Sequence, residues 1–332
     1  MRTKNSLQAL LASLIVLPLL PLPAGEGRGD GRSFVYVTNE KSGNVTVIDS
    51  STDKVVETIP VGSRPRGIQA SPDGKRIYVA VSDRADKSKE SITVIDTVSL
   101  KVIARLPSGV DPEQFAVSPD GKLAVIADED ANAAAFLDLA SGKLLATVPV
   151  GTEPEGVGIT PDGKFAWVTA ESANNVTIFD LAKRAAVGTV EVESRPRVVV
   201  FSADGRRAYI SCEIAATVLV VDTASRARIA RIELAAPEKP EGTVFSPDRK
   251  SYFVATSHGN SIAVIDAATN KIESRIPVGQ RPWGIAITAE GKIYTANGKS
   301  NDVSVVDANT RRVLATIPAG DGPWGVAVAR QR

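Results

Sequence analysis

Short apolar runs separated by turn residues recur along almost the whole chain. In one representative unit these runs are 67–70, 77–81, 92–95 and 102–106. Short runs rich in β-branched residues and bounded by Gly, Pro, Asp and Ser are typical of β-strands. Outside the N-terminal segment, no stretch has the 3.6-residue apolar period of an amphipathic helix. The pattern therefore predicts an all-β protein whose strands come in sets of four.

Two markers show that these sets repeat. A run like Val-Ile-Asp ends at seven aspartates spaced by 47, 42, 42, 42, 44 and 41 residues. A Ser-Pro-Asp-Gly turn or a variant recurs six times at similar spacing, and Arg249 replaces its glycine once, where we expect a turn that is either strained or differently shaped. We expect each aspartate to cap the turn after its strand. The seven aspartates are Asp49, Asp96, Asp138, Asp180, Asp222, Asp266 and Asp307.

Units of this length with four strands each are the signature of a β-propeller blade. Seven strand markers with only six turn markers indicate a closed ring, in which the first blade is built from both ends of the chain. The chain would start at Ser33 in the second strand of that blade and end with its first strand near Val328. We predict a seven-bladed β-propeller of four-stranded antiparallel blades over 33–329. The C-terminal strand joins the N-terminal three and closes the ring.

The N-terminal segment has the features of a secretory signal peptide. Arg2 and Lys4 precede an apolar stretch of 14 residues, which is shorter than the roughly 20 residues that span a membrane. We predict a signal peptide over 1–24, with cleavage near Ala24, and a glycine-rich linker over 25–32. The mature protein is then expected in the periplasm or secreted, without a membrane span.

Composition excludes several classes of function. Cys212 is the only cysteine and His258 the only histidine, which excludes a disulfide scaffold and most histidine-based metal hydrolases. With 39 basic and 38 acidic residues the chain does not resemble a bulk polyanion binder. We expect Cys212 to be a buried inert thiol, Trp167 to lie in the core and His258 to lie on a surface turn. We interpret residues 128–130 as a solvent-facing charged turn rather than a calcium site.

The sequence Tyr36-Val37-Thr38-Asn39 spells the signature of the YVTN-repeat β-propellers, and the wider repeat pattern resembles that family over 33–329. It is most similar to the exported propellers called PQQ-dependent catabolism-associated, which are linked to alcohol oxidation by quinoproteins. The resemblance implies a seven-bladed periplasmic propeller with no defined activity. The stretches that match the quinoprotein docking motif lack its tryptophan, and no haem-attachment motif is present. We therefore expect no cofactor and no metal.

The loop that enters each inner strand carries a proline in every unit and differs from unit to unit in charge. In a propeller these seven loops converge on one mouth of the central channel. Units three and four would supply an acidic arc, units two and five basic groups, and the last two loops adjacent indoles. Arginine can grip a carboxylate and tryptophan can stack on a flat ring. The mouth residues are Arg64, Arg66, Glu113, Glu155, Arg195, Arg197, Glu241, Arg281, Trp283 and Trp324.

We interpret the protein as a monomeric, non-catalytic binding module, accessory to a periplasmic oxidation pathway. Its partner would be a small anionic or aromatic ligand, or a segment of a periplasmic protein. The alternative is a lactonase-type hydrolase in which Glu113, Glu155 or Glu241 acts as base beside Arg66 or Arg197. A second alternative, single-stranded nucleic-acid binding, is disfavoured by the near-zero net charge and the acidic arc.

Overall fold

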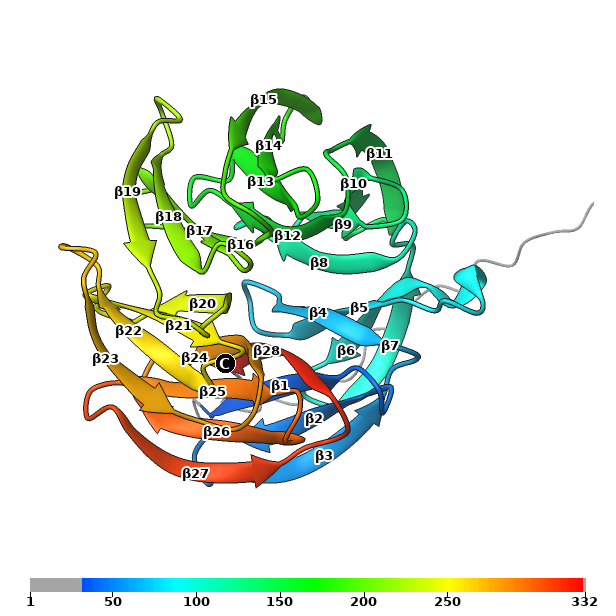
Figure 1. Cartoon of the computed structure of the whole chain (residues 1–332). Coiled ribbons are helices and arrows are strands. Elements are labelled where there is room, and N and C mark those ends of the chain that lie inside the picture. The colour runs from blue at the N-terminus through cyan, green and yellow to red at the C-terminus, as the bar shows by residue number, and fades with distance from the viewer. Residues whose placement is uncertain (1–31, 331–332) are drawn as a thin grey trace, which may run out of the picture.

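The computed structural model describes residues 32–330, which fold into seven four-stranded antiparallel sheets arranged around a central axis (Figure 1). The expected signal peptide and nearly all of the expected linker lie outside the described residues. The predicted seven-bladed propeller is confirmed. Within this described range a single 3-10 turn, η1 (Lys87–Lys89), interrupts the β-structure, in the blade where the markers are 47 residues apart.

Each blade runs from an inner strand at the axis to an outer strand at the rim. Blade 1 holds β28 (Pro323–Arg330), β1 (Ser33–Asn39), β2 (Asn44–Asp49) and β3 (Lys54–Pro60). Blade 2 holds β4 (Pro65–Ala70), β5 (Arg76–Val81), β6 (Ser91–Asp96) and β7 (Lys101–Leu106). Blade 3 holds β8 (Pro112–Val117), β9 (Leu123–Asp128), β10 (Ala133–Asp138) and β11 (Lys143–Pro149). Blade 4 holds β12 (Pro154–Ile159), β13 (Phe165–Ala170), β14 (Asn175–Asp180) and β15 (Ala185–Glu191).

The remaining blades follow the same order. Blade 5 holds β16 (Pro196–Phe201), β17 (Arg207–Cys212), β18 (Thr217–Asp222) and β19 (Arg228–Glu233). Blade 6 holds β20 (Pro240–Phe245), β21 (Ser251–Thr256), β22 (Ser261–Asp266) and β23 (Ile272–Pro277). Blade 7 holds β24 (Pro282–Ile287), β25 (Lys292–Asn297), β26 (Asp302–Asp307) and β27 (Arg312–Pro318).

Ring closure follows the prediction. Strand β1 pairs with β2 on one side and with β28 on the other, so the two ends of the described chain share blade 1. In the second pairing Val35 lies opposite Val328. Joining the ends in one hydrogen-bonded sheet leaves no open edge between the first and last blades.

The core lies between adjacent blades, because each sheet buries apolar side chains against the next one. Trp167 of blade 4 packs edge-on against Phe201 of blade 5, with ring centroids 5.7 Å apart. Cys212 is buried in the same cluster, and burial raises the pKa of its thiol to about 12. The expected core position of Trp167 and the expected buried thiol are both confirmed.

The repeated aspartates act as turn caps, as expected. The Asp138 carboxylate accepts hydrogen bonds from both the backbone N–H and the hydroxyl of Ser141, each at 2.7 Å. Equivalent backbone bonds occur in all seven blades. Arg249 has φ +62°, which confirms the strained left-handed turn where glycine is replaced.

Inner strands of neighbouring blades approach closely, and glycine makes this approach possible. A Cβ added at Gly156 would lie 1.9 Å from the carbonyl oxygen of Arg197 in the next blade. The equivalent distance from Gly67 to the carbonyl oxygen of Glu113 is 2.5 Å. Any side chain at these positions would push apart the strands that line the channel.

Candidate functional site at the channel mouth

The seven loops that enter the inner strands gather at one end of the channel. Each inner strand begins at the predicted proline, and the residue before it is left-handed in six blades, for example Arg195 at φ +61°. The side chains that follow the prolines form what we call the inner ring. Its members are Arg66, Glu113, Glu155, Arg197, Glu241, Trp283 and Trp324.

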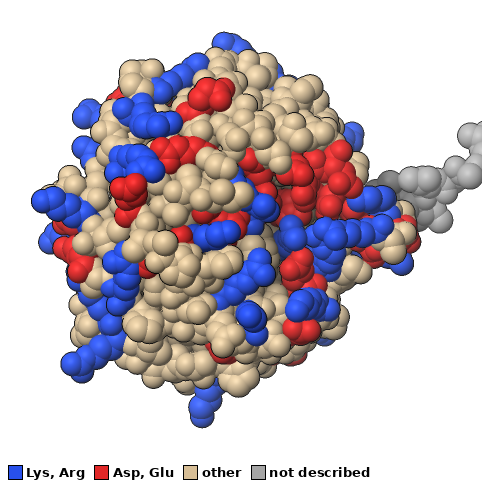
Figure 2. Space-filling model, viewed as in Figure 1, with Lys and Arg blue, Asp and Glu red and all other residues tan. Residues whose placement is uncertain are grey.

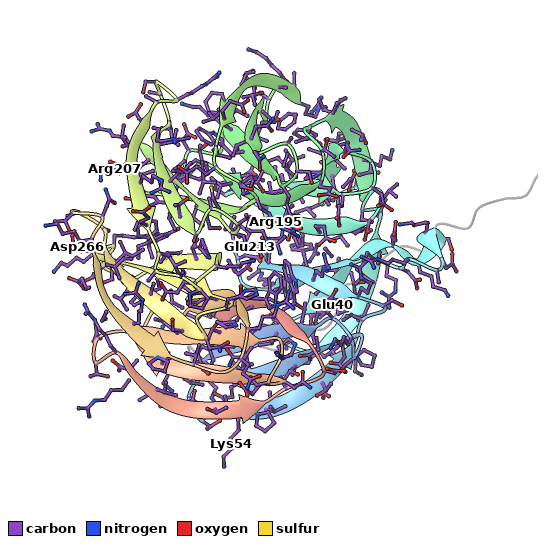
Figure 3. All side chains as sticks on the ribbon, viewed as in Figure 1. Glu40, Lys54, Arg195, Arg207, Glu213 and Asp266 are labelled. Carbon is purple, nitrogen blue, oxygen red and sulfur yellow. The ribbon has the colours of Figure 1, made fainter. Side chains whose placement is uncertain are left out.

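A second set of residues lies beside this ring. In every blade the residue that follows the second strand donates its backbone N–H to the carbonyl before the proline, as Glu213 does to Arg195 at 2.8 Å. In Figure 3 Arg195, Glu213 and Glu40 lie toward the centre of the molecule, whereas Lys54, Arg207 and Asp266 lie toward its rim. We call the residues that donate these backbone N–H groups the outer ring. Its members are Glu40, Ser82, Glu129, Glu171, Glu213, Ser257 and Gly298.

Two cavities meet at the inner ring. The mouth cavity has a volume of about 510 Å³ and opens above Arg197, Trp283 and Trp324. The channel cavity beneath it has a volume of about 160 Å³, and the same three side chains line its upper end. Glu155 and Glu241 line the channel cavity only. The three shared side chains therefore form the boundary between the mouth cavity and a smaller chamber.

Arg197 lies at the centre of the largest ion-pair cluster. Its side chain is only 8% exposed, and its Nε lies 3.0 Å from Glu241 and 3.3 Å from Glu213. Its Nη1 contacts Glu171 and lies 3.6 Å from Glu155. These four carboxylates come from blades 4, 5 and 6, so one guanidinium holds three blades together. Such a buried cation is stabilised only while its carboxylate partners remain in place.

A second cluster surrounds Arg66. Its guanidinium contacts Glu113, which is fully buried, and lies 3.0 Å from Glu40 through Nε. The neighbouring Arg64 lies 3.2 Å from Asp111. The basic and acidic groups expected at this mouth are therefore present and adjacent, but they largely neutralise one another across blades. Figure 2 shows this face, where basic and acidic side chains gather next to each other beside its centre.

One group of carboxylates has spacing suitable for a cation. Asp111, Glu113 and Glu129 each offer an oxygen, and these oxygens lie within 4.8 Å of one another. Arg64 and Arg66 already contact two of the three carboxylates, so their guanidinium groups supply positive charge to the cluster. These are the described residues best placed to hold a metal ion, and arginine competes with a cation for them.

The two indoles form the aromatic wall of the mouth. Trp283 and Trp324 stack with centroids 6.0 Å apart and planes 23° from parallel. Arg197 and Arg281 lie over Trp283 at 5.0 and 4.8 Å, and Arg66 lies 5.8 Å from Trp324. Cations over an indole face are attracted by the negative π-surface. The expected pair of adjacent indoles is confirmed, and each carries arginine on its face.

One side of the mouth cavity keeps uncompensated positive charge. Arg281 and Lys299 line this cavity, and within residues 32–330 neither lies within ion-pair distance of a carboxylate. Arg195, which also lines it, is 43% exposed and is shared between Glu171 and Glu213, each at 3.0 Å. Arg281 and Lys299 are therefore available to pair with an anionic group that enters the mouth.

Glu241 is the inner-ring carboxyl with the most distinctive environment. It is 2% exposed, accepts a hydrogen bond from the Ser257 hydroxyl at 2.9 Å and contacts Arg197. Burial raises its pKa to about 7; the charge of Arg197 opposes this rise and that of Glu213 adds to it. Burial and the charge of Glu155 also raise the pKa of Glu113 well above its ordinary value. A carboxyl that titrates near neutral pH suits proton transfer.

Two expectations about single residues have different outcomes. His258 lies on the turn between β21 and β22 and is exposed, as expected. The interpretation of residues 128–130 as a solvent-facing turn is wrong for Asp128, which is 1% exposed. The Asp128 carboxyl lies against Gly109, and a Cβ added to Gly109 would be 2.0 Å from it. Because glycine has no side chain, the Asp128 carboxyl can occupy this space. Burial and the charge of Glu90 raise the pKa of Asp128 to about 8.

Sequence reasoning missed the outer ring. Glu40, Glu171 and Glu213 pair with inner-ring arginines, and Ser257 contacts Glu241. A signal was available, because each of these residues follows the last residue of the second strand in its unit. Aligning the units on that position would have revealed a second variable column beside the proline column.

A closed seven-bladed propeller with a charged, tryptophan-walled channel mouth defines the class of the protein. The family model described as Lactonase, 7-bladed beta-propeller matches residues 29–157 and 151–317. The chain therefore belongs to this lactonase family of seven-bladed β-propellers.

Among curated proteins, the uncharacterized protein YncE of Salmonella typhi is 37% identical over 60 residues. That match covers 18% of this chain and 17% of the length of YncE.

Two of the solved structures similar to this chain illustrate the shared fold. The periplasmic gluconolactonase PpgL of Pseudomonas aeruginosa is 20% identical, with a TM-score of 0.75 over 91% of this chain and 100% of that one. A Bacteroides fragilis protein provisionally assigned as a 6-phosphogluconolactonase is 19% identical, with a TM-score of 0.76 over 91% of this chain and 99% of that one. At these identities the similarity establishes the architecture. Within the described residues no helix has the length and apolarity to cross a membrane.

Proposed function

We propose that the protein hydrolyses a lactone at the channel mouth, with Glu241 as the general base. The observation that carries the proposal is the buried Glu241 carboxyl, which lines the channel cavity and lies 3.0 Å from Arg197. Burial raises the pKa of this carboxyl to about 7. Membership of the lactonase family supports this alternative better than the non-catalytic interpretation.

The arrangement supplies the parts that ester-ring opening requires. Each Glu241 oxygen already accepts one bond, from Ser257 or from Arg197, and retains a lone pair for a water molecule. Glu241 would take a proton from that water molecule while the water oxygen attacks the lactone carbonyl carbon. Arg197 would stabilise the negative charge that develops on the carbonyl oxygen. When the ring C–O bond breaks, protonated Glu241 would return the proton to the leaving oxygen.

The two cavities would divide the substrate. A lactone ring would lie at the boundary formed by Arg197, Trp283 and Trp324, with its carbonyl oxygen toward Arg197 and its carbonyl carbon facing the water held by Glu241. A negatively charged substituent would remain in the mouth cavity near Arg281 and Lys299. In this proposal the small anionic ligand expected from the sequence is the substrate.

Three further expectations enter as proposals. We place the mature protein in the periplasm as a monomer; PpgL is itself named a periplasmic enzyme. We also propose the accessory role in quinoprotein-linked oxidation, and the resemblance of the repeat motifs is its support. A lactonase would suit such a pathway, because oxidation of a cyclic hemiacetal yields a lactone.

The test is a turnover assay on γ- and δ-lactones with and without a carboxylate or phosphate group, following acid release with a pH indicator. We expect Glu241→Gln to lower kcat by roughly 100-fold or more with little change in KM. Glu191→Gln is the matched control, because Glu191 is exposed on the outer strand β15. Binding of lactones without turnover in the wild-type protein would refute the proposal and restore the non-catalytic interpretation.

A further inference from the structure

A chain of hydrogen-bonding groups leads from the channel to the protein surface. The Ser257 hydroxyl donates to Oε1 of Glu241 at 2.9 Å. On its other side the same hydroxyl oxygen lies 3.2 Å from Nδ1 of His258. Glu241 lines the channel cavity and His258 is exposed on the β21–β22 turn. The Ser257 hydroxyl therefore connects the buried Glu241 carboxyl to the His258 imidazole, which is in contact with solvent.

The chain is consistent with protons moving in either direction. When Glu241 is ionised, the Ser257 hydroxyl donates to Glu241, and a protonated His258 would donate its Nδ1–H to the serine oxygen. If the Nδ1 proton passes to the serine oxygen while the serine proton passes to Oε1, Glu241 becomes neutral. The imidazolium then becomes a neutral ring with its proton on Nε2, and the serine hydroxyl is regenerated. One proton has moved inward, and no bond other than O–H and N–H has changed.

We propose that His258 and Ser257 form a proton relay that connects Glu241 to solvent. This relay rests on the proposed function, because it supplies and removes the proton that Glu241 exchanges during turnover. His258 and Ser257 are relay residues and touch no substrate. His258 is exposed, which argues against a direct role as the catalytic base. A proton relay, however, needs one end in contact with solvent, and His258 provides it.

The groups around the relay define its electrostatic setting. Glu241 faces Arg197 through Oε2, and Glu213 from the outer ring adds negative charge nearby. Partial desolvation, together with the positive charges of Lys239 and Arg281 and a smaller contribution from Lys299, lowers the pKa of His258; Glu213 opposes this decrease. The backbone carbonyl of Lys239 is a competing acceptor for the Ser257 hydroxyl, at the longer distance of 3.5 Å.

The first test does not depend on activity. His258 is the only histidine, so its imidazole C–H signal in an NMR spectrum is assigned without ambiguity. We expect the wild-type signal to titrate in two steps, one for the ring and one near pH 7 for Glu241. In Glu241→Gln the second step should disappear, whereas the titration of the ring itself should remain.

Ser257 variants separate a hydrogen-bonded relay from simple attraction through space. Ser257→Ala should reduce the second step, because only attraction through space then connects the two groups, whereas Ser257→Thr, which keeps the hydroxyl, should retain it at full size. Identical His258 titrations in wild type, Glu241→Gln and Ser257→Ala would overturn the proposal. A second step of undiminished size in Ser257→Ala would also overturn it.

The second test uses turnover at low buffer concentration. We expect the wild-type rate to be nearly independent of buffer, and the rate of His258→Ala to fall several-fold and recover when imidazole is added. A His258→Ala rate equal to wild type at low buffer would refute the relay. Absence of lactone turnover in the wild type would refute the proposed function, while the NMR titration would still decide the relay.

Discussion

Replacing Arg197 with alanine removes the cation shared by four carboxylates of three blades. The Arg197 side chain is 8% exposed and its four partners are 3–10% exposed, so water reaches none of them freely. Removing one partner of a buried ion pair typically costs about 3–5 kcal/mol, because the remaining charge is left without compensation. We therefore expect Arg197→Ala to lower the free energy of unfolding by about 3–5 kcal/mol at pH 8.

The loss should depend on pH, and the sign follows from proton binding. Without Arg197 the pKa of the Glu241 carboxyl rises further above its value in the unfolded chain. The folded variant therefore binds protons as the pH falls, and protonation removes the uncompensated charge. We expect the difference from wild type to be largest at pH 8 and to shrink by at least half at pH 5.

Urea unfolding followed by tryptophan fluorescence at both pH values measures this difference. Arg228→Ala is the matched control, because Arg228 is 45% exposed and pairs with Glu193 at the surface. Exposed pairs of this kind contribute about 0–1 kcal/mol. A loss below 1 kcal/mol for Arg197→Ala at pH 8, or an equal loss at both pH values, would refute the reasoning about the buried cluster.

Three further predictions concern the same region. Gly156→Ala should destabilise the fold by about 1–3 kcal/mol in urea unfolding, because its Cβ would lie 1.9 Å from the Arg197 carbonyl oxygen; an unchanged midpoint would contradict this packing. As the pH rises from about 4.5 to 7, the free energy of unfolding of the wild type should fall by about 3 kcal/mol, because the pKa of Glu241 is raised to about 7 in the folded state. Urea unfolding across this pH range should show that Glu241→Gln lacks this decrease. Trp283→Ala should raise KM for a bound lactone roughly 3- to 10-fold with kcat nearly unchanged; equal KM values would remove the indole from the binding surface.

The sequence predicts the fold well because its determinants are local and repeated. The aspartate caps, the Pro-Asp-Gly turns and the β-branched runs each act within about six residues, and seven copies make the period evident. Ring closure was also predictable, since the marker counts differ by one. The prolines fixed the inner ring because each begins an inner strand.

The pairing of charges at the mouth could not be predicted in the same way. Arg197 meets Glu155, which lies 42 residues before it, and Glu241, which lies 44 residues after it. Such contacts depend on how neighbouring blades are rotated, which no local pattern encodes. Asp128 illustrates the same limit, because its burial depends on the missing side chain of Gly109 in another loop. The relay through Ser257 likewise requires the side-chain geometry that only the folded blade provides.

The pH dependence of lactone opening tests the central claim most directly. With Glu241 as general base, kcat/KM should rise with pH to a plateau, with a midpoint near 7, because only the carboxylate accepts the proton of water. Glu241→Gln should lower the plateau by roughly 100-fold or more and abolish this midpoint. A Glu241→Gln profile that keeps both the wild-type height and the wild-type midpoint would contradict the account.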